Sequence, residues 1–135
     1  MLIVKDLVKT YPNGTQALKG VSFEVEEGEF LAVIGLSGSG KSTLLRCINR
    51  LIEPTSGTIL WNGIDITAAK GKEIRLIRRQ IGMIFQQFNL VKRSSVNTNV
   101  LSGRLGYVPT FPSLLHTFSK ADHERARSNL AMVGL

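Results

Sequence analysis

The sequence lacks several features that define particular classes of protein. Its 135 residues include a single cysteine, Cys47, which excludes an internal disulfide and favours a small packing residue over a reactive thiol. Its longest apolar runs are about five residues, far short of the roughly 18 that a membrane-spanning helix needs. The start, Met1–Asp6, lacks the basic, apolar and small-residue order of a signal peptide. With 43% hydrophobic and 20% charged residues, the composition indicates a globular, cytoplasmic protein.

Carboxylates are scarce in the second half of the chain. Residues 1–69 carry 6 Lys or Arg against 7 Asp or Glu, whereas residues 70–135 carry 11 against 3. After Glu73 the only acidic residues are Asp122 and Glu124, and both lie in a polar stretch rather than after an apolar run. The net charge of +7 therefore arises from the second half, because residues 1–69 carry a net charge of −1.

The most basic stretch is Lys70–Arg79, in which Glu73 is the single acidic residue. Such a patch is typical of nucleic-acid binding. However, no base-stacking aromatic residue interleaves with the basic residues, and Ile74 and Ile77 would turn inward on the same helix. The sequence therefore favours a solvated helix face, and we expect no nucleic-acid partner.

The strongest motif is Gly35–Ser42, which matches the phosphate-loop (Walker A) pattern G-x-x-x-x-G-K-[ST]. An apolar run, Phe30–Ile34, precedes it as a predicted strand, and an amphipathic run, Leu44–Leu51, follows as a predicted helix. In such a loop the glycines let backbone N–H groups turn toward an anion, Lys41 reaches the β- and γ-phosphates, and the Ser42 hydroxyl ligates Mg²⁺. A tight glycine-rich turn would explain the glycines but not the Lys-Ser pair. The motif therefore predicts nucleoside triphosphate binding.

Short apolar or alternating segments on either side of the loop predict strands. They are Leu2–Leu7, Val21–Val25 and Thr58–Trp61, with turns at Pro12–Gly14, Glu26–Glu29 and Asn62–Gly63. Because these strands are closely spaced, we expect an antiparallel sheet beside the nucleotide site. A further apolar run, Ile81–Phe85, is long enough for a buried strand and too short for a helix.

The last third of the chain carries weaker signals. Val96–Leu101 predicts a short helix, and residues 103–118, with two prolines, predict an irregular segment. Ser119–Asp122 resembles a capping box that opens a closing helix. The residues that this helix would bury are Ala126, Leu130 and Val133.

Taken together, these motifs resemble the N-terminal half of an ABC-transporter ATPase. The resemblance rests on the phosphate loop, on Tyr11 upstream of it, on Thr55–Gly57 before a strand and on Ile81–Gln86, where an apolar run leads into a glutamine. More narrowly, the chain resembles the ATP-binding subunit of bacterial phosphonate importers. That likeness rests on less specific strings: L-L-R-C-I-N-R-L from Leu44, I-G-M-I-F-Q-Q-F-N-L-V from Ile81 and N-V-L-S-G-R-L-G from Asn99.

The resemblance implies an α/β fold, that of the P-loop NTPase nucleotide-binding domain, with the antiparallel strands as its N-terminal portion. Residues 1–135 would form one partial domain, and ATP and Mg²⁺ are the implied cofactors. The implied nucleotide-binding residues are Tyr11, Gly35, Ser37, Gly38, Ser39, Gly40, Lys41, Ser42 and Thr43, and the implied Mg²⁺ contacts are Ser42 and Gln86.

Two of these implied roles compete with simpler ones. Tyr11 would stack on the adenine, whereas an aromatic residue at a strand end also serves to cover a sheet edge. Gln86 would contact Mg²⁺ and the attacking water and sense a membrane partner, whereas a polar residue commonly ends a buried strand. Gln87 lies beside it, and the choice of Gln86 follows the family register after Phe85.

The family completes its hydrolytic site with parts that we do not find in this sequence. These are an apolar strand ending in Asp-Glu, a switch histidine and an L-S-G-G-Q segment. Leu101–Gly103 begins like the last of these but continues with Arg104, only 15 residues after Gln86, which favours local turn chemistry. His116 and His123 follow no apolar strand. We therefore expect a truncated chain that lacks the catalytic carboxylates, exposes the sides of its central sheet and aggregates readily.

The implied function is the ATP-binding component of an ABC importer, for phosphonates, that couples ATP to transport. Its implied partners are an inner-membrane permease and a second ATPase subunit, which would place it peripherally on the cytoplasmic face of the bacterial inner membrane. Two alternatives stay open at this point. One is an importer of another substrate, such as polar amino acids, and the other is a nucleotide-binding remnant that binds ATP without hydrolysing it.

Overall fold

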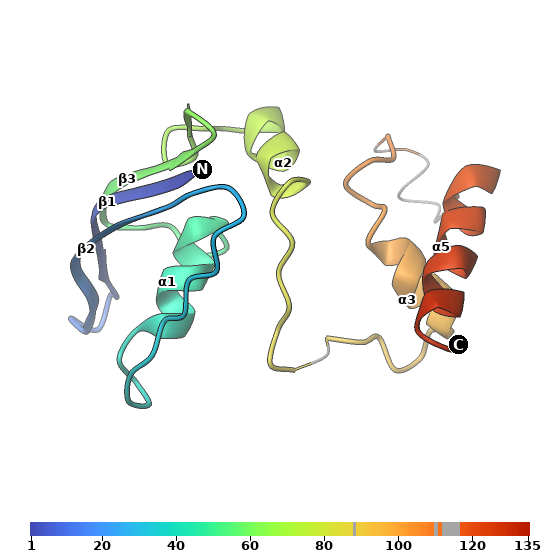
Figure 1. The fold of residues 1–135 in the computed structure, drawn as a ribbon, viewed down its shortest axis with the longest axis horizontal. Coiled ribbons are helices and arrows are strands. Elements are labelled where there is room, and N and C mark those ends of the chain that lie inside the picture. Colours follow the sequence, from blue (N-terminus) through green and yellow to red (C-terminus); the bar gives the residue numbers. More distant parts are fainter. Residues whose placement is uncertain (88, 110, 112–116) are drawn as a thin grey trace. The chain divides into compact units, whose positions relative to one another are not determined.

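The computed structural model describes residues 1–87, 89–109, 111 and 117–135. These residues fall into two compact units, Met1–Ile81 and Gly82–Leu135, and each is described on its own. Figure 1 shows the strands and two helices, α1 (Lys41–Ile48) and α2 (Lys72–Arg78), in the first unit, coloured blue to green. The helices α3 (Val96–Ser102) and α5 (Lys120–Met132) lie in the second unit, coloured orange to red. The prediction of one partial domain over residues 1–135 stays a prediction.

The first unit, all of whose residues are described, holds a four-stranded antiparallel sheet and two helices. The strands are β1 (Leu2–Thr10), β2 (Gln16–Val25), β3 (Ser56–Trp61) and β4 (Ile64–Asp65). Their order in the sheet is β2-β1-β3-β4, which confirms the expected antiparallel portion. The Asn62–Gly63 turn joins β3 to β4, as its sequence predicts.

A bulge in β1 keeps its apolar side chains on one face of the sheet. Between Val4 and Leu7 the strand has one residue more than β2 opposite it, and Asp6 adopts a φ of +47°. The hydroxyl of Ser22 on β2 accepts a hydrogen bond from the Asp6 N–H at 2.7 Å. Because of the extra residue, Val4 and Leu7 are both buried although they are three positions apart.

Gly57 on β3 lies opposite this bulge, where the two backbones approach closely. Its φ is +97°, and a Cβ there would stand 2.5 Å from the Asp6 carbonyl oxygen and 2.6 Å from the Leu7 Cα. Both are backbone atoms, which no side-chain rotation can move away. The close pairing of β1 with β3 therefore requires glycine at this position.

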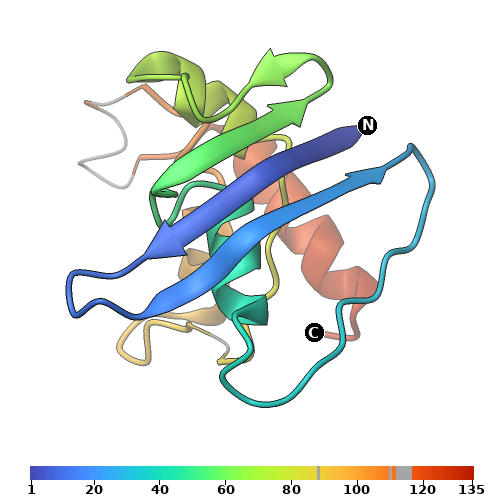
Figure 2. The ribbon, with the colours of Figure 1, turned by 90° about the vertical axis from the view of Figure 1, so that its left-hand side faces the viewer.

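The core of the first unit forms where α1 lies against one face of the sheet (Figure 2). The helix buries one side, as the spacing of its apolar residues predicts. The buried residues of this core are Val4, Leu7, Leu18, Leu44, Cys47, Ile48, Ile59, Ile66, Ala69 and Ile77. Cys47 has no exposed surface, and burial raises the pKa of its thiol, so it is a packing residue as expected.

Two arginines of the first unit donate hydrogen bonds to backbone carbonyls. Arg78, from the basic stretch, donates from Nε to the Asn49 carbonyl at 3.0 Å and from Nη2 to the Arg50 carbonyl at 2.5 Å. Arg50 in turn donates from Nη1 to the carbonyls of Ile66 and Ala69. Arg78 thus caps the carboxyl end of α1, where a cation is favourable. This contact supports a structural role for part of the basic stretch.

Two predicted strands are wrong. Phe30–Ile34 forms no strand, and no hydrogen bond joins its backbone to any other described residue. The side chains of Phe30 and Ile34 are both 91% exposed, and in the segment Ile81–Phe85, which is not a strand either, Ile84 is fully exposed. An apolar run becomes a strand only when a neighbouring strand completes its hydrogen bonds, and the described sheet of β1 to β4 includes neither run.

In the described part of the second unit the helices are α3 (Val96–Ser102) and α5 (Lys120–Met132), and both predicted helices are confirmed. Ser95 caps α3, and the capping box of α5 is present, with Ser119 and Asp122 bonding each other's backbone. Val133 is 71% exposed, so its predicted burial is wrong. Most of residues 110–116, including His116, lies outside the described residues.

No helix among the described residues is long and apolar enough to cross a bilayer.

The close approach at Gly57 predicts a large loss of stability on Gly57→Ala. The added Cβ would clash with the backbone at the β1 bulge and strain a left-handed residue, so unfolding should become easier by more than about 1 kcal/mol. Gly63→Ala is the matched control, because Gly63 has a φ of +80° but open space around it. Urea unfolding followed by circular dichroism measures both, and equal losses would contradict the clash.

The unpaired run at residues 30–34 predicts self-association. Its exposed apolar side chains and free backbone groups resemble an unprotected sheet edge. Ile34→Lys should shift sedimentation velocity profiles toward monomer at a given concentration. Leu76→Lys, on the exposed face of α2, is the control and should change the profile much less. A wild-type chain that sediments as a monomer and melts cooperatively would contradict this prediction.

The capping box of α5 predicts a pH dependence of the second unit. Hydrogen bonds from Ser119, and then the Arg104 guanidinium at 2.6 Å, hold the pKa of Asp122 below its usual range. A lowered folded-state pKa stabilises the helix above the usual aspartate pKa, and this stabilisation disappears as pH falls through the lowered value. Asp122→Asn should remove this acid-dependent loss of α5 helicity, measured by circular dichroism. Glu124→Gln, at an exposed position on the same helix, should leave it unchanged.

Candidate functional site

The phosphate loop connects the unpaired run to α1 in the first unit. Gly38 and Gly40 have φ values of +82° and +92°, which glycine adopts without strain. Gly40 also passes close to β2, because a Cβ there would stand 2.4 Å from the Ala17 carbonyl oxygen. The glycine at this position therefore lets the first turn of α1 begin directly against the sheet.

The Lys41 side chain folds back into the loop. Its Nζ donates hydrogen bonds to the carbonyl oxygens of Gly35 at 2.8 Å and Leu36 at 2.7 Å, and to the Ser39 Oγ at 3.3 Å. An ammonium group is thus held at the centre of the loop by neutral partners only. No carboxylate neutralises it among these contacts, so it is available to an anion.

The amino end of α1 differs from those of α3 and α5. The latter two are capped by Ser95 and Ser119, whereas the cap position of α1 is Gly40, which has no side chain to offer, and its first turn contains no acidic residue. The first N–H groups of an α-helix have no acceptor within the helix. Together with the helix dipole and Lys41, they make this end suitable for a phosphate group.

The two residues implied as Mg²⁺ contacts lie in different units. Ser42 is exposed on the first turn of α1, directly after Lys41. Gln86 is exposed in the second unit, as is Gln87. Among the described residues no cluster of three or more His, Cys, Asp or Glu side chains could hold a metal ion. A hydroxyl beside bound phosphates fits Mg²⁺, which commonly takes few protein ligands and uses phosphate oxygens and water for the rest.

Tyr11 lies beside the first turn of α1. Its hydroxyl is 3.2 Å from the Oγ1 of Thr43, and its ring lies 5.3 Å from the Nζ of Lys9. The structure thus brings Tyr11 and Thr43, two of the implied nucleotide-binding residues, into contact. The contact with Lys9 was not anticipated, although alternation along a strand puts residues two apart on one face and so offers a signal for it.

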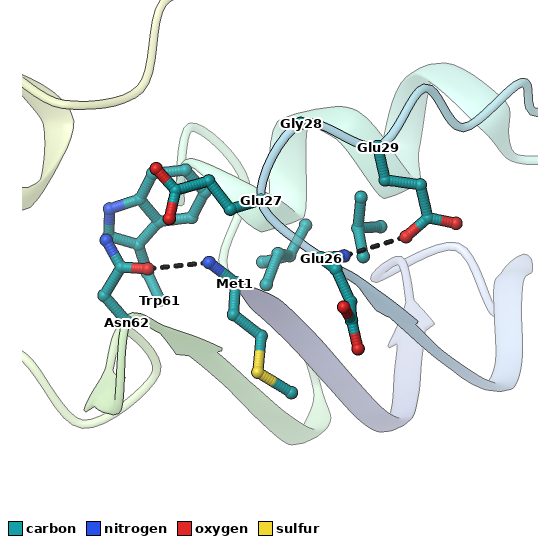
Figure 3. Close-up of a pocket in the computed structure, with 9 residues that line it drawn as sticks. Met1, Glu26, Glu27, Gly28, Glu29, Trp61 and Asn62 are labelled. Atoms are coloured by element: carbon teal, nitrogen blue, oxygen red, sulfur yellow. Dashed lines mark hydrogen bonds between the residues drawn. The ribbon is translucent and has the colours of Figure 1, made fainter.

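A pocket of about 370 Å³ lies elsewhere in the first unit, beside the start of β1 (Figure 3). The amino group of Met1 donates to the Asn62 Oδ1 at 2.8 Å, and the Glu29 carboxylate accepts from the Glu26 N–H at 2.8 Å. With Glu27, three carboxylates line this pocket. Their negative charge disfavours a polyphosphate, so the phosphate loop is the better candidate site.

The chain is similar to curated relatives over its whole length. It is 57% identical over 135 residues to the phosphonates import ATP-binding protein PhnC of Shouchella clausii and 56% identical over 136 residues to that of Bdellovibrio bacteriovorus. All of this chain is covered in both cases, but only 51% and 52% of the relatives. The chain therefore spans about half the length of the curated relatives it matches.

Solved structures give the same family. The ATP-binding cassette MJ0796, in a dimeric post-hydrolysis state bound to ADP and Pi, is 35% identical, with a TM-score of 0.82 over all of this chain and 58% of that one. The cbiO1 protein of Clostridium perfringens, part of an ABC transporter complex, is 31% identical, with a TM-score of 0.71 over 99% of this chain and 50% of that one. The family described as ABC transporter matches residues 18–135, and the chain belongs to this family.

Proposed function

We infer that this chain is the ATP-binding component of an ABC importer for phosphonates, and that it binds Mg-ATP through Gly35–Thr43. The observation that carries the proposal is the Lys41 ammonium, which lies inside the loop at the uncapped end of α1 with neutral partners only. A polyphosphate would exchange these weak carbonyl contacts for charge-assisted hydrogen bonds, which are about twice as strong.

Each residue of the loop has a distinct task in this proposal. The backbone N–H groups from Gly38 to Thr43 surround the phosphates, and Lys41 turns from the loop carbonyls to the β- and γ-phosphates. The Ser42 hydroxyl would hold Mg²⁺, with Gln86 as a second proposed contact, and the ion would supply positive charge to the phosphates. The Tyr11 ring would stack on the adenine. In an assembly that supplies the missing catalytic groups, Gln86 would also orient the attacking water and respond to the membrane partner.

Support for the substrate and the partners comes from the relatives. Proteins that are 57% and 56% identical to this chain are named as phosphonate import ATP-binding proteins. A second ATPase subunit is supported by the dimeric state of the solved cassette, and a permease by the transporter complex that contains cbiO1. These partners would place the protein peripherally at the cytoplasmic face of the inner membrane.

An apolar groove in the second unit supports the permease contact. The groove is about 590 Å³ in volume and lies between the segment before α3, α3 itself and the end of α5. Its apolar lining includes Val91, Val96, Val100, Leu130 and Leu135. A groove of this kind suits a short amphipathic helix, such as a permease loop would present.

We also propose that this stretch of chain binds ATP without turning it over by itself. The two carboxylates after Glu73 both lie on α5 and already have partners. Asp122 is bonded to Ser119 and Arg104, and the Glu124 carboxylate is 4.0 Å from the Lys120 ammonium. Neither follows a strand that would direct it toward a γ-phosphate.

Replacement of Lys41 tests the nucleotide site. Lys41→Ala should reduce Mg-ATP affinity at least tenfold, because the substitution removes the one cation in the loop, and isothermal titration calorimetry measures the change. Arg46→Ala, an exposed cation further along α1, is the control and should bind like wild type. Unchanged binding in Lys41→Ala would contradict the phosphate assignment. Phosphate release from wild-type chain above background would contradict the absence of turnover.

A further inference from the structure

We propose that Lys9 and Thr43 are positioning residues that hold the Tyr11 ring ready for the base of the nucleotide, and that the Tyr11–Thr43 contact couples the base subsite to the phosphate loop. This inference rests on the proposed function, since it concerns the same nucleotide. The juxtaposition that carries it joins β1, the turn after it and the first turn of α1.

The backbone of Tyr11 is fixed before any side-chain contact is considered. Its N–H donates to the Thr15 carbonyl at 2.9 Å, and its carbonyl accepts from the Gly14 N–H at 2.9 Å. The Asn13 Oδ1 closes the same turn by accepting from the Thr15 N–H at 3.1 Å. The ring can therefore change direction only by rotation of the side chain.

Lys9 restricts that rotation from one side. Its Nζ lies 5.3 Å from the centre of the Tyr11 ring, within the range of a cation–π interaction, and donates to the Glu53 carbonyl at 2.6 Å. The ammonium is thus held by the backbone carbonyl of Glu53, which follows α1 in the sequence. A cation on one face of a ring leaves the opposite face for a flat partner and withdraws π density from it, which favours stacking on an electron-rich base.

Thr43 restricts the ring from its hydroxyl end. The two hydroxyl oxygens are 3.2 Å apart and partly buried. Thr43 lies on the same helical turn as Lys41 and Ser42, so a shift of this turn on phosphate binding is transmitted to the Tyr11 hydroxyl. Tyr11 is therefore held at its ring face, at its hydroxyl and at its backbone. Because its side chain is already restricted, a base that stacks on it costs less conformational entropy.

The same contacts could instead serve only to stabilise the packing of β1 against α1. The two roles differ in which binding affinities they change. A purely structural role changes the affinity for every ligand of the loop equally, because it acts through the stability of the site. A positioning role affects a ligand with a base and spares a ligand that consists of phosphates only.

The test compares the affinities of the full chain for Mg-ATP and for Mg-tripolyphosphate by isothermal titration calorimetry. Tyr11→Phe keeps the ring and removes the hydroxyl, and Lys9→Met keeps most of the side chain and removes the charge. Each should weaken Mg-ATP binding by roughly three- to tenfold and leave tripolyphosphate binding within about twofold of wild type. Lys5→Met, which removes an exposed charge from the same strand, should change neither affinity.

A second variant isolates the Thr43 contact. In a Thr43→Val background, Tyr11→Phe should have no further effect on Mg-ATP affinity, because the hydroxyl then has no partner to lose. Thr43→Ser, which retains a hydroxyl, should restore the effect of Tyr11→Phe. Circular dichroism spectra identical to wild type establish that each variant folds.

The outcomes separate this inference from the proposed function. If Lys9→Met and Tyr11→Phe weaken both ligands equally, or weaken neither, the positioning role is overturned while nucleotide binding stands. If the wild-type chain binds neither Mg-ATP nor Mg-tripolyphosphate, the proposed function fails and this inference fails with it.

Discussion

The contact between Gly40 and β2 is the constraint on which the candidate site depends. Because Gly40 has no side chain, the first turn of α1 begins directly against the Ala17 carbonyl. The buried face of the helix then continues into the core with Leu44, Cys47 and Ile48. The sheet, the helix and the helical end of the loop are thereby packed against one another without a ligand. The candidate site residues that follow Gly40 take their positions from this packing.

The basic stretch illustrates how a local charge excess can be used inside a fold. Counted along the sequence, Lys70–Arg79 looks like a surface for an anionic partner. In the structure Arg78 caps the end of α1 and Arg50 bonds two carbonyls of the segment before α2. Such contacts satisfy carbonyl groups that would otherwise lack a partner at a helix end. Part of the charge thus serves the architecture of the first unit.

Much of the fold could be predicted because its signals are local. The turn at Asn62–Gly63, the capping box at Ser119–Asp122 and the spacing of apolar residues in α1 each act within a few residues. The failures, at Phe30–Ile34 and Ile81–Phe85, concern segments whose structure depends on neighbours rather than on their own composition. An apolar pentapeptide has the same sequence whether or not a strand lies beside it. The bulge opposite Gly57 escaped prediction for the same reason.

In the candidate site, too, local sequence patterns predict some features and not others. The phosphate loop was readable because its chemistry needs particular residues at fixed spacing, and Lys41 lies where that spacing places it. The contact of Tyr11 with Thr43 joins residues that are 32 positions apart in the sequence, and no short pattern encodes it. Side-chain partners across such separations follow from the packing of α1 on the sheet.

Lys41 also holds the end of the loop that follows the unpaired run Phe30–Ile34. At its helical end the loop is anchored by Gly40 and the core, but at its other end Phe30–Ile34 makes no hydrogen bond to any described residue. The ammonium, bonded to the carbonyls of Gly35 and Leu36, is therefore a tether for the free end. If Lys41 turns to a bound phosphate, as proposed, that end would lose these hydrogen bonds, and the ligand would have to replace them. Filling the loop and ordering it would then be a single event.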